Sequence, residues 1–336
     1  MEPTNTNRTV LLSSGYTMPI VGLGMFLTRN ENELDSAVTA AIEAGYRHFD
    51  TAFAYTNEHL LGRTLKRILD DENKVTREDL FITTKLPPNG LDPKDVEYFF
   101  RKSLKDLQLD YIDLYLIHFP VAARRTADDY AIFPMKENGK FDGKDIDPVD
   151  TWKVLENLVD EGVVRSIGIS NFNSEQIRRI YDNARIKPAV LQVECHAYLP
   201  QFELQELCKE LKIALTAYSP IGAPSAQPRT DETIKPEDKD KEHALIADPT
   251  LTPLCEKYGK SPAQILLRYL VQRNIIVIPK STNPKRLKEN IQIFDFSLSE
   301  EDMEVMKSMA KNRRYFSFTS YKGMPDHPQF PFRIPY

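Results

Sequence analysis

Residues 80–118 decide the fold. The runs LFITTK (80–85) and YIDLYLIH (111–118) are short and mainly apolar, and they flank a segment with helical periodicity. In that segment, 93–107, the apolar residues form one stripe along a helix: Val96, Phe99, Phe100, Leu104 and Leu107. Apolar strands that alternate with a helix predict a parallel sheet covered by helices.

The same alternation recurs along most of the chain. We expect eight strands, at 20–24, 47–50, 80–85, 111–118, 164–170, 190–194, 213–218 and 275–279. Such strands build either an open doubly wound sheet or a closed (β/α)8 barrel. The open sheet usually carries Gly-x-Gly-x-x-Gly after its first strand, whereas Gly22-Leu23-Gly24 has Leu27 in place of the third glycine. We therefore predict a single (β/α)8 TIM-barrel domain over 1–336, with the barrel at about 20–295 and a C-terminal helix and tail at 299–336.

Three segments lie outside this alternation. Residues 8–18 predict a β-hairpin that turns at Ser13-Ser14-Gly15 and plugs the bottom of the barrel. Residues 222–248 are rich in Pro, Asp, Glu and Lys, and loops of this length are usually functional or disordered. Residues 312–336 form a tail with many aromatic residues and little helical pattern. We expect a plug, a long loop and an aromatic tail as additions to the barrel.

Composition and charge exclude several classes of protein. The chain has 336 residues, a net charge of −5, 41% hydrophobic and 28% charged residues, a balance typical of soluble globular proteins. An acidic chain does not favour nucleic acid, and no run approaches the roughly 18 apolar residues of a membrane span. The N-terminus lacks an apolar signal core, and three scattered cysteines, Cys195, Cys208 and Cys255, suit neither a disulfide scaffold nor a zinc site. These features predict a cytoplasmic protein with no metal, nucleic-acid or membrane partner.

Four complementary side chains follow the expected strands. In such barrels the active site gathers at the C-terminal ends of the strands, where Asp50, Lys85 and His118 stand, with Tyr55 just beyond Asp50. A lysine ammonium lowers the pKa of a neighbouring phenol, a carboxylate keeps the lysine charged, and a histidine donates to a carbonyl oxygen as negative charge develops. Each residue alone has an ordinary structural explanation, but together they predict proton delivery to a carbonyl group. Because no side chain supplies a hydride, a nicotinamide cofactor is implied.

Five stretches carry a resemblance to a known family: 45–52 (GYRHFDTA), 114–120 (LYLIHFP), 168–172 (GISNF), 192–196 (QVECH) and 278–281 (IPKS). From about Leu11 to about Lys311 the chain resembles an aldo-keto reductase of the aldose reductase type. The resemblance implies that Asp50, Tyr55, Lys85 and His118 form the family's catalytic tetrad. It also implies NADP(H) as the cofactor and a 222–248 loop that folds over it.

The resemblance further assigns residues to the cofactor. It places Ser170, Asn171 and Gln192 at the nicotinamide carboxamide and Tyr218 under the ring. The other cofactor positions that it implies are Met25, Asp50, Ser219, Ile221, Lys280, Ser281, Thr282, Arg286, Glu289 and Asn290. The residues themselves agree in part, because an acidic chain carries a basic cluster here: Lys280, Lys285, Arg286 and Lys288. Arg286 is expected at the 2′-phosphate of NADPH, since a planar guanidinium suits a phosphate.

The expected substrate pocket departs from that of aldose reductase, which is lined by several tryptophans. The one tryptophan here, Trp152, lies on the core stripe of a helix. By resemblance the pocket residues are Phe26, Ala54, Tyr55, Pro87, His118, Phe119 and Phe133, and the aromatic tail completes the pocket. These side chains predict a roomier apolar pocket that prefers lipophilic carbonyls, such as ketosteroids or aromatic aldehydes, to open-chain sugars.

The sequence thus predicts a monomeric, NADPH-dependent reductase that converts a small aldehyde or ketone to an alcohol with the proton from Tyr55. The alternatives are a sugar (aldose or xylose) reductase, an NADP-dependent alcohol dehydrogenase, and a cofactor-binding structural protein without turnover. NAD is an alternative cofactor, because Glu289 could offer a carboxylate to the free ribose hydroxyl. The complete tetrad argues against a structural role, and His118 argues against a double-bond reductase, because relatives with that activity replace this histidine. His48, His196 and Cys195 are expected to be structural.

Overall fold

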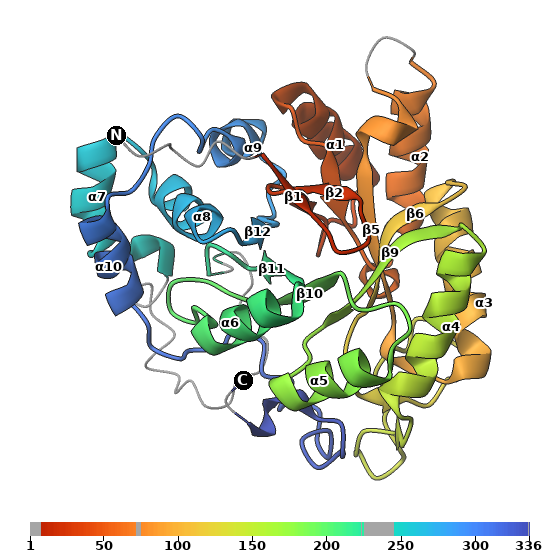
Figure 1. The fold of residues 1–336 in the computed structure, drawn as a ribbon. Coiled ribbons are helices and arrows are strands. Elements are labelled where there is room, and N and C mark those ends of the chain that lie inside the picture. The colour runs from red at the N-terminus through yellow and green to blue at the C-terminus, as the bar shows by residue number, and fades with distance from the viewer. Residues whose placement is uncertain (1–7, 72–74, 223, 225–244, 335) are drawn as a thin grey trace.

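Parallel strands form the wall of a barrel in this computed structural model, which describes residues 8–71, 75–222, 224, 245–334 and 336. The sheet has eight strands in the order β12-β11-β10-β9-β6-β5-β4-β3. These strands are β3 (Leu23–Gly24), β4 (His48–Asp50), β5 (Phe81–Leu86), β6 (Ile112–Ile117), β9 (Val164–Ser170), β10 (Val190–Glu194), β11 (Ala214–Tyr218) and β12 (Ile276–Val277). Figure 1 shows them inside a ring of helices.

The sheet closes between its first and last strands. Val21 and Val277 form a parallel bridge, the Gly22 N–H donates to the Val277 carbonyl at 2.8 Å, and the Val277 N–H donates to the Ile20 carbonyl at 2.8 Å. These bonds confirm the predicted (β/α)8 barrel and exclude the open sheet. The predicted strands at 20–24 and 275–279 are shorter than expected, because regular pairing covers only β3 and β12 beside this bridge.

The glycines at this seam are required by close packing. A Cβ at Gly22 would lie 2.3 Å from Nδ1 of His48, and a Cβ at Gly24 would lie 2.8 Å from the Ile278 carbonyl oxygen. Close packing thus explains both glycines without a phosphate-binding fingerprint, in agreement with the failed match to Gly-x-Gly-x-x-Gly. His48 is fully buried next to the seam, as expected of a structural histidine.

The helices cover the outside of the barrel. They are α1 (Glu31–Ala44), α2 (Glu58–Leu69), α3 (Pro93–Leu107), α4 (Pro148–Asp160), α5 (Ser174–Asn183), α6 (Phe202–Leu211), α7 (Leu251–Tyr258), α8 (Pro262–Gln272), α9 (Pro284–Ile291) and α10 (Glu300–Ser308). Asp92 caps α3 and Asp147 caps α4, each followed by a proline in the first turn, where a missing N–H costs nothing. The predicted stripe of α3 faces the core, and Trp152 is buried on α4. No helix in the described ranges is both long and apolar enough to cross a membrane.

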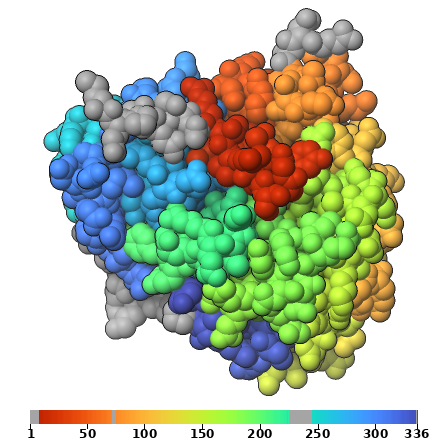
Figure 2. All heavy atoms as spheres, in the orientation of Figure 1, coloured from red at the N-terminus to blue at the C-terminus, as the bar shows by residue number. Residues whose placement is uncertain are grey.

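The N-terminal hairpin is present as predicted. Strand β1 (Thr9–Leu11) pairs antiparallel with β2 (Thr17–Pro19), and Gly15 takes the left-handed φ of +88° in the turn. Met18 is fully buried, and Ser14 Oγ lies 2.8 Å from Oγ of Ser166, near the start of β9. The hairpin therefore covers the N-terminal end of the strands, and Figure 2 shows it in red across the visible face. The predicted belt loop falls almost entirely outside the described residues, which omit 223 and 225–244.

A buried carboxylate joins α2, β5 and α3. Glu58 is 3% exposed and accepts hydrogen bonds from the hydroxyls of Thr84 at 2.5 Å and Ser103 at 2.8 Å. Burial raises the pKa of Glu58 to about 7, although both hydroxyls oppose the shift. Because the folded pKa lies above that of the unfolded chain, ionisation of Glu58 works against folding.

We expect this group to make the fold less stable as pH rises from about 4.5 to about 7, because the unfolded chain loses its proton first. The loss is about 3 kcal/mol, and it is complete above the folded pKa. Glu58→Gln should remove this part of the pH dependence. Urea unfolding of the wild type and of Glu58→Gln at pH 5 and pH 8 tests this prediction. If the two proteins differ in unfolding free energy by the same amount at both pH values, the prediction is wrong.

Candidate active site

The C-terminal ends of β4, β5 and β6 bring three of the predicted residues to one rim of the barrel. Asp50 ends β4, Lys85 is the last residue but one of β5, and His118 follows β6. Tyr55 lies at the end of a 3-10 turn, η1 (Phe53–Tyr55), that leaves the rim after β4. The parallel register keeps these strand ends side by side, which is why the spacing in sequence translates into contact in space.

Lys85 is the centre of this group. Its ammonium donates to Asp50 Oδ1 at 2.6 Å, to the Thr51 carbonyl at 2.7 Å and to the Tyr55 hydroxyl at 3.3 Å. The Lys85 side chain is fully buried and that of Asp50 is 2% exposed. The His118 ring lies edge-on to the Tyr55 ring, with centroids 5.7 Å apart. The structure thus brings all four predicted side chains together.

Both oxygens of Asp50 are occupied. Lys85 binds Oδ1, and the side-chain amide of Gln192 on β10 donates to Oδ2 at 2.7 Å. The resemblance assigned Gln192 to the cofactor and gave it no contact with Asp50. The carboxylate is therefore held from opposite sides, and it holds Lys85 in turn.

The protonation of Tyr55 corrects one prediction. Burial raises the pKa of Tyr55 well above its ordinary value, and the nearby Asp50 carboxylate raises it further. The pKa of Tyr55 is therefore raised in this structure and not lowered as predicted, because burial disfavours the charged phenolate. Burial, together with the charge of Lys85, lowers the pKa of His118 well below its usual range. Burial also lowers the pKa of Lys85, and Asp50 opposes that shift.

At neutral pH the site therefore presents a protonated phenol and a neutral imidazole. Each carries one hydrogen to donate. Such a pair can hold a carbonyl oxygen and deliver a proton to it.

The residues predicted to hold a nicotinamide share the same rim. Asn171 follows Ser170, the last residue of β9, with a left-handed φ of +63°. Its amide donates to the His118 carbonyl at 2.9 Å, and its oxygen accepts from the Tyr218 hydroxyl, at the end of β11, at 2.8 Å. Asn171 thus joins the strand that carries His118 to Tyr218.

The other predicted cofactor residues lie in loops after β3, β11 and β12 or in α9: Met25, Ser219, Ile221, Lys280, Ser281, Thr282, Arg286, Glu289 and Asn290. The side chains of Lys280 and Arg286 form no ion pair with any described residue. Asn283 caps α9 by accepting the Arg286 N–H, and Glu289 lies 3.8 Å from Lys285. Two free cations at a helix N-terminus fit an anionic phosphate group.

The predicted pocket residues form an aromatic wall with the tail. The Phe26 ring lies 5.1 Å from the Tyr55 ring, and the Phe119 ring lies 6.3 Å from that of Phe133. The tail adds Phe318 and Phe332, whose rings are 4.7 Å and 6.1 Å from Phe119. The other two predicted pocket residues are not aromatic: Ala54 is half-buried in η1, and Pro87 is buried directly after β5.

Sequence reasoning did not assign a role to Phe332 or to Glu194. Phe332 is one of many aromatic residues in the tail, and the sequence does not single it out. The available signal for Glu194 was a carboxylate at the end of a buried strand, two residues after Gln192. Glu194 is fully buried and accepts hydrogen bonds from the tail's backbone.

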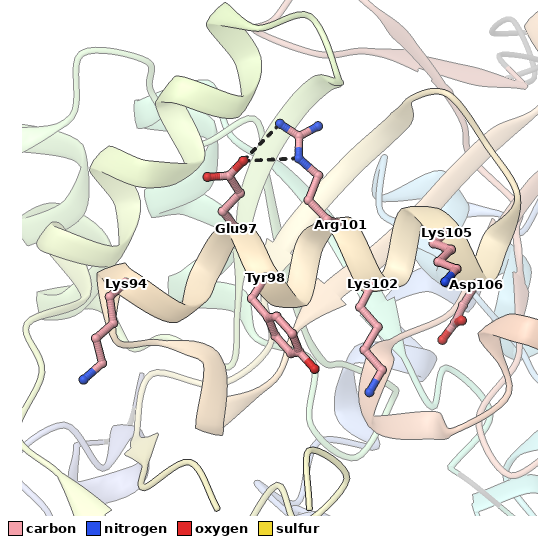
Figure 3. A pocket seen from close by; sticks show the side chains of 7 residues that line it. All are labelled: Lys94, Glu97, Tyr98, Arg101, Lys102, Lys105 and Asp106. Atoms are coloured by element: carbon pink, nitrogen blue, oxygen red, sulfur yellow. Dashed lines mark hydrogen bonds and ion pairs between the residues drawn. The ribbon is translucent and has the colours of Figure 1, made fainter. Parts of the chain in front are cut away.

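A surface hollow of about 680 Å³ lies elsewhere, on the outer face of α3. Figure 3 shows its lining residues, which are Lys94, Glu97, Tyr98, Arg101, Lys102, Lys105 and Asp106. Arg101 pairs with Glu97 and Glu161, and Lys102 pairs with Asp129. The hollow is open and away from the strand ends, so we do not assign the chemistry to it.

His196 and Cys195 are fully buried, as expected of structural residues. His196 Nε2 lies 3.0 Å from Glu194 Oε1, and burial raises the pKa of the Cys195 thiol to about 12. Across the ranges that the structure describes, no group of three or more His, Cys, Asp and Glu side chains is placed to hold a metal ion.

Comparison with known proteins gives one answer along nearly the whole chain. Residues 20–311 match the model of the Aldo/keto reductase family. The chain is 44% identical to aldo-keto reductase family 1 member A1 of Xenopus tropicalis, over 97% of each chain, and 43% identical to the human protein of the same name, over 97% of this chain and 98% of that one. It superposes on the aldose reductase of Schistosoma japonicum with a TM-score of 0.87 and 38% identity, over 98% of this chain and 100% of that one. The chain therefore belongs to the aldo/keto reductase family, whose members are oxidoreductases that generally use NADP(H).

Proposed function

We propose that this enzyme reduces an aldehyde or ketone to the alcohol with NADPH, and that Tyr55 donates the proton. The observation that carries the proposal is the buried contact of the Lys85 ammonium with both Asp50 and the Tyr55 hydroxyl. When bound, NADPH supplies the hydride. The carbonyl carbon gains that hydride and the oxygen gains the proton, so that an alcohol and NADP⁺ result.

The four side chains have distinct roles in this proposal. Tyr55 keeps its proton until negative charge develops on the carbonyl oxygen, because burial holds its pKa high. The phenolate that then forms faces the Lys85 ammonium at 3.3 Å, which stabilises it. His118 stays neutral and orients the carbonyl oxygen as a hydrogen-bond donor. Asp50 takes no part in the proton transfer; it positions the Lys85 ammonium.

We assign the cofactor to the residues at the same end of the barrel. Ser170, Asn171, Gln192 and Tyr218 would hold the nicotinamide, and Arg286 with Lys280 would hold the 2′-phosphate. Lys280 and Arg286 support this assignment because they have no carboxylate partner among the described residues. An NAD site would instead offer a carboxylate to the ribose; Glu289 already lies 3.8 Å from Lys285.

Arg286→Ala is expected to weaken NADPH binding by roughly 1.5–3 kcal/mol, the range for a charge-assisted hydrogen bond, and to leave NADH binding almost unchanged. Fluorescence titration of both cofactors measures this. Lys285→Ala is the matched control, since it removes a cation of the same helix that faces Glu289. Equal losses for NADPH and NADH would remove Arg286 from the phosphate site.

We further propose a lipophilic carbonyl, such as a ketosteroid or an aromatic aldehyde, as the substrate. Phe119, Phe133 and Phe318 offer apolar area, whose burial contributes about 25 cal/mol per Å². Their side chains have no hydrogen-bonding group for the hydroxyls of a sugar. Steady-state NADPH oxidation with sugars, aliphatic aldehydes, quinones and ketosteroids tests this. A strong preference for xylose or glucose would overturn the substrate class, and faster alcohol oxidation would favour a dehydrogenase.

NADPH binding without turnover of any carbonyl would instead favour a structural protein. We expect the enzyme to work as a cytoplasmic monomer, which size-exclusion chromatography and cell fractionation check. Each of these outcomes leaves the family assignment intact.

A further inference from the structure

Glu194 fastens the tail to the barrel. The Tyr315 N–H donates to its Oε1 at 2.6 Å, and the Phe316 N–H donates to its Oε2 at 2.9 Å. His196 supplies a third donor: its Nδ1 accepts from the Leu199 N–H, so its Nε2 carries the hydrogen and donates to Oε1 at 3.0 Å. The carboxylate is fully buried, and three donors offset the cost of burying its charge.

Only a carboxylate meets this arrangement. The two backbone N–H groups end on different oxygens, whereas an amide has one acceptor oxygen and a nitrogen that donates. A glutamine at this position would leave one tail N–H without an acceptor and would set its own N–H₂ against another donor. Within residues 314–320, the backbone hydrogen bonds to the barrel that the structure shows are those of the Tyr315 and Phe316 N–H groups.

The fastened segment carries the pocket wall. The Phe316 ring lies edge-on to Tyr218 at 5.8 Å, and two residues later the Phe318 ring lies 4.7 Å from Phe119. Phe318 adopts a left-handed φ of +58°, which a bulky side chain disfavours. The tail therefore needs external holds to keep Phe318 against Phe119. Glu194 is the hold two residues before the strained position, between the Arg313 N–H bond to the Tyr198 carbonyl and the Phe141 N–H bond to the Lys322 carbonyl.

We propose that Glu194 is a positioning residue that sets the enzyme's selectivity for large carbonyl substrates by holding residues 315–318 of the tail. The inference rests on the proposed carbonyl reduction. It places the control of selectivity outside the four residues of the chemistry, since Glu194 acts on substrate only through Phe316 and Phe318.

Glu194→Gln should raise KM for a ketosteroid or a bulky aromatic aldehyde at least tenfold, the effect of losing one charge-assisted hydrogen bond. Both kcat and KM for propanal, an aldehyde of only three carbons, should stay within about twofold. Tyr315→Pro removes one of the N–H donors while keeping Glu194, and it should give the same pattern. It also keeps the test open if Glu194→Gln fails to fold.

Glu156→Gln is the matched control. Glu156 is also buried, and its Oε1 accepts two consecutive backbone N–H groups, from Arg185 at 2.6 Å and Ile186 at 2.8 Å, far from the tail in sequence. Because both N–H groups end on one oxygen, a glutamine keeps both bonds and loses only the assistance of the charge. The variant should therefore lower stability without changing the ratio of the KM values for large and small substrates. If Glu156→Gln shifts that ratio as much as Glu194→Gln does, the effect is general loosening and the proposal is wrong.

A second measurement does not depend on turnover. Trypsin cleaves after Arg313 and Arg314, at the start of the fastened segment, and cleavage of the folded Glu194→Gln variant should be at least tenfold faster than in wild type. In a double variant, Phe318→Ala should add little to the KM change of Glu194→Gln, because both act through one contact. Unchanged cleavage, equal KM shifts for small and large substrates, or multiplicative effects would overturn the proposal. Faster cleavage in a protein that turns over no carbonyl would instead contradict the proposed function and leave the fastening intact.

Discussion

Tyr55→Phe should reduce kcat at least a hundredfold while NADPH binds nearly as well as in wild type. A positioned general acid contributes roughly 10²–10⁴-fold, and the substitution removes only the hydroxyl that Lys85 contacts at 3.3 Å. The ring remains, so its contacts with Phe26 and His118 remain as well. Single-turnover rates and a cofactor titration separate the two effects.

The control for this variant is Tyr46→Phe. Tyr46 is a fully buried tyrosine whose hydroxyl donates to the Leu287 carbonyl at 3.0 Å, outside the tetrad. Its loss should cost stability and leave kcat close to wild type. Near-normal turnover of Tyr55→Phe would remove Tyr55 from the proposed chemistry.

Lys85→Met should lower kcat by a comparable factor and also destabilise the fold. The Lys85–Asp50 ion pair is almost completely buried, and removal of one partner of such a pair costs about 3–5 kcal/mol, because the other charge stays buried and unpaired. The Tyr55 phenolate would also lose the cation that faces it. Urea unfolding and kcat, measured on the same preparation, report the two losses.

A double variant separates them. Asp50→Asn combined with Lys85→Met removes the orphaned charge, so part of the stability should return while kcat stays low. If turnover returns together with stability, the part that Lys85 plays is structural, and the proposed stabilisation of the phenolate is wrong.

The sequence was sufficient for the framework of the site and insufficient for its electrostatics. Asp50, Lys85 and His118 could be placed together because the ends of parallel strands in a barrel meet at one rim. The pKa of Tyr55 could not be predicted, because the sequence shows the charge of Lys85 but not the burial of the phenol. Burial depends on every element packed around the phenol, and no local pattern contains it.

The tail marks a second limit. Its aromatic composition indicated a role in the pocket, but a run of rings without helical or strand periodicity does not say which ring meets which. Phe318 lies against Phe119 in a left-handed turn, and this turn follows two residues whose N–H groups bind Glu194, on a strand more than a hundred residues earlier. The short strands β3 and β12 have a similar cause, since the closing seam depends on segments from the two ends of the barrel sequence.

The hold on the tail has a consequence for how this enzyme can diversify. Glu194 grips backbone amides, which every residue except proline possesses, and it ignores the side chains at 315 and 316. Mutations along the tail can therefore exchange the groups that line the pocket without undoing the attachment. Natural selection or protein design can therefore change the tail's side chains to accept new substrates while the tail stays attached. Glu194 itself cannot be changed in this way, because the attachment depends on its carboxylate.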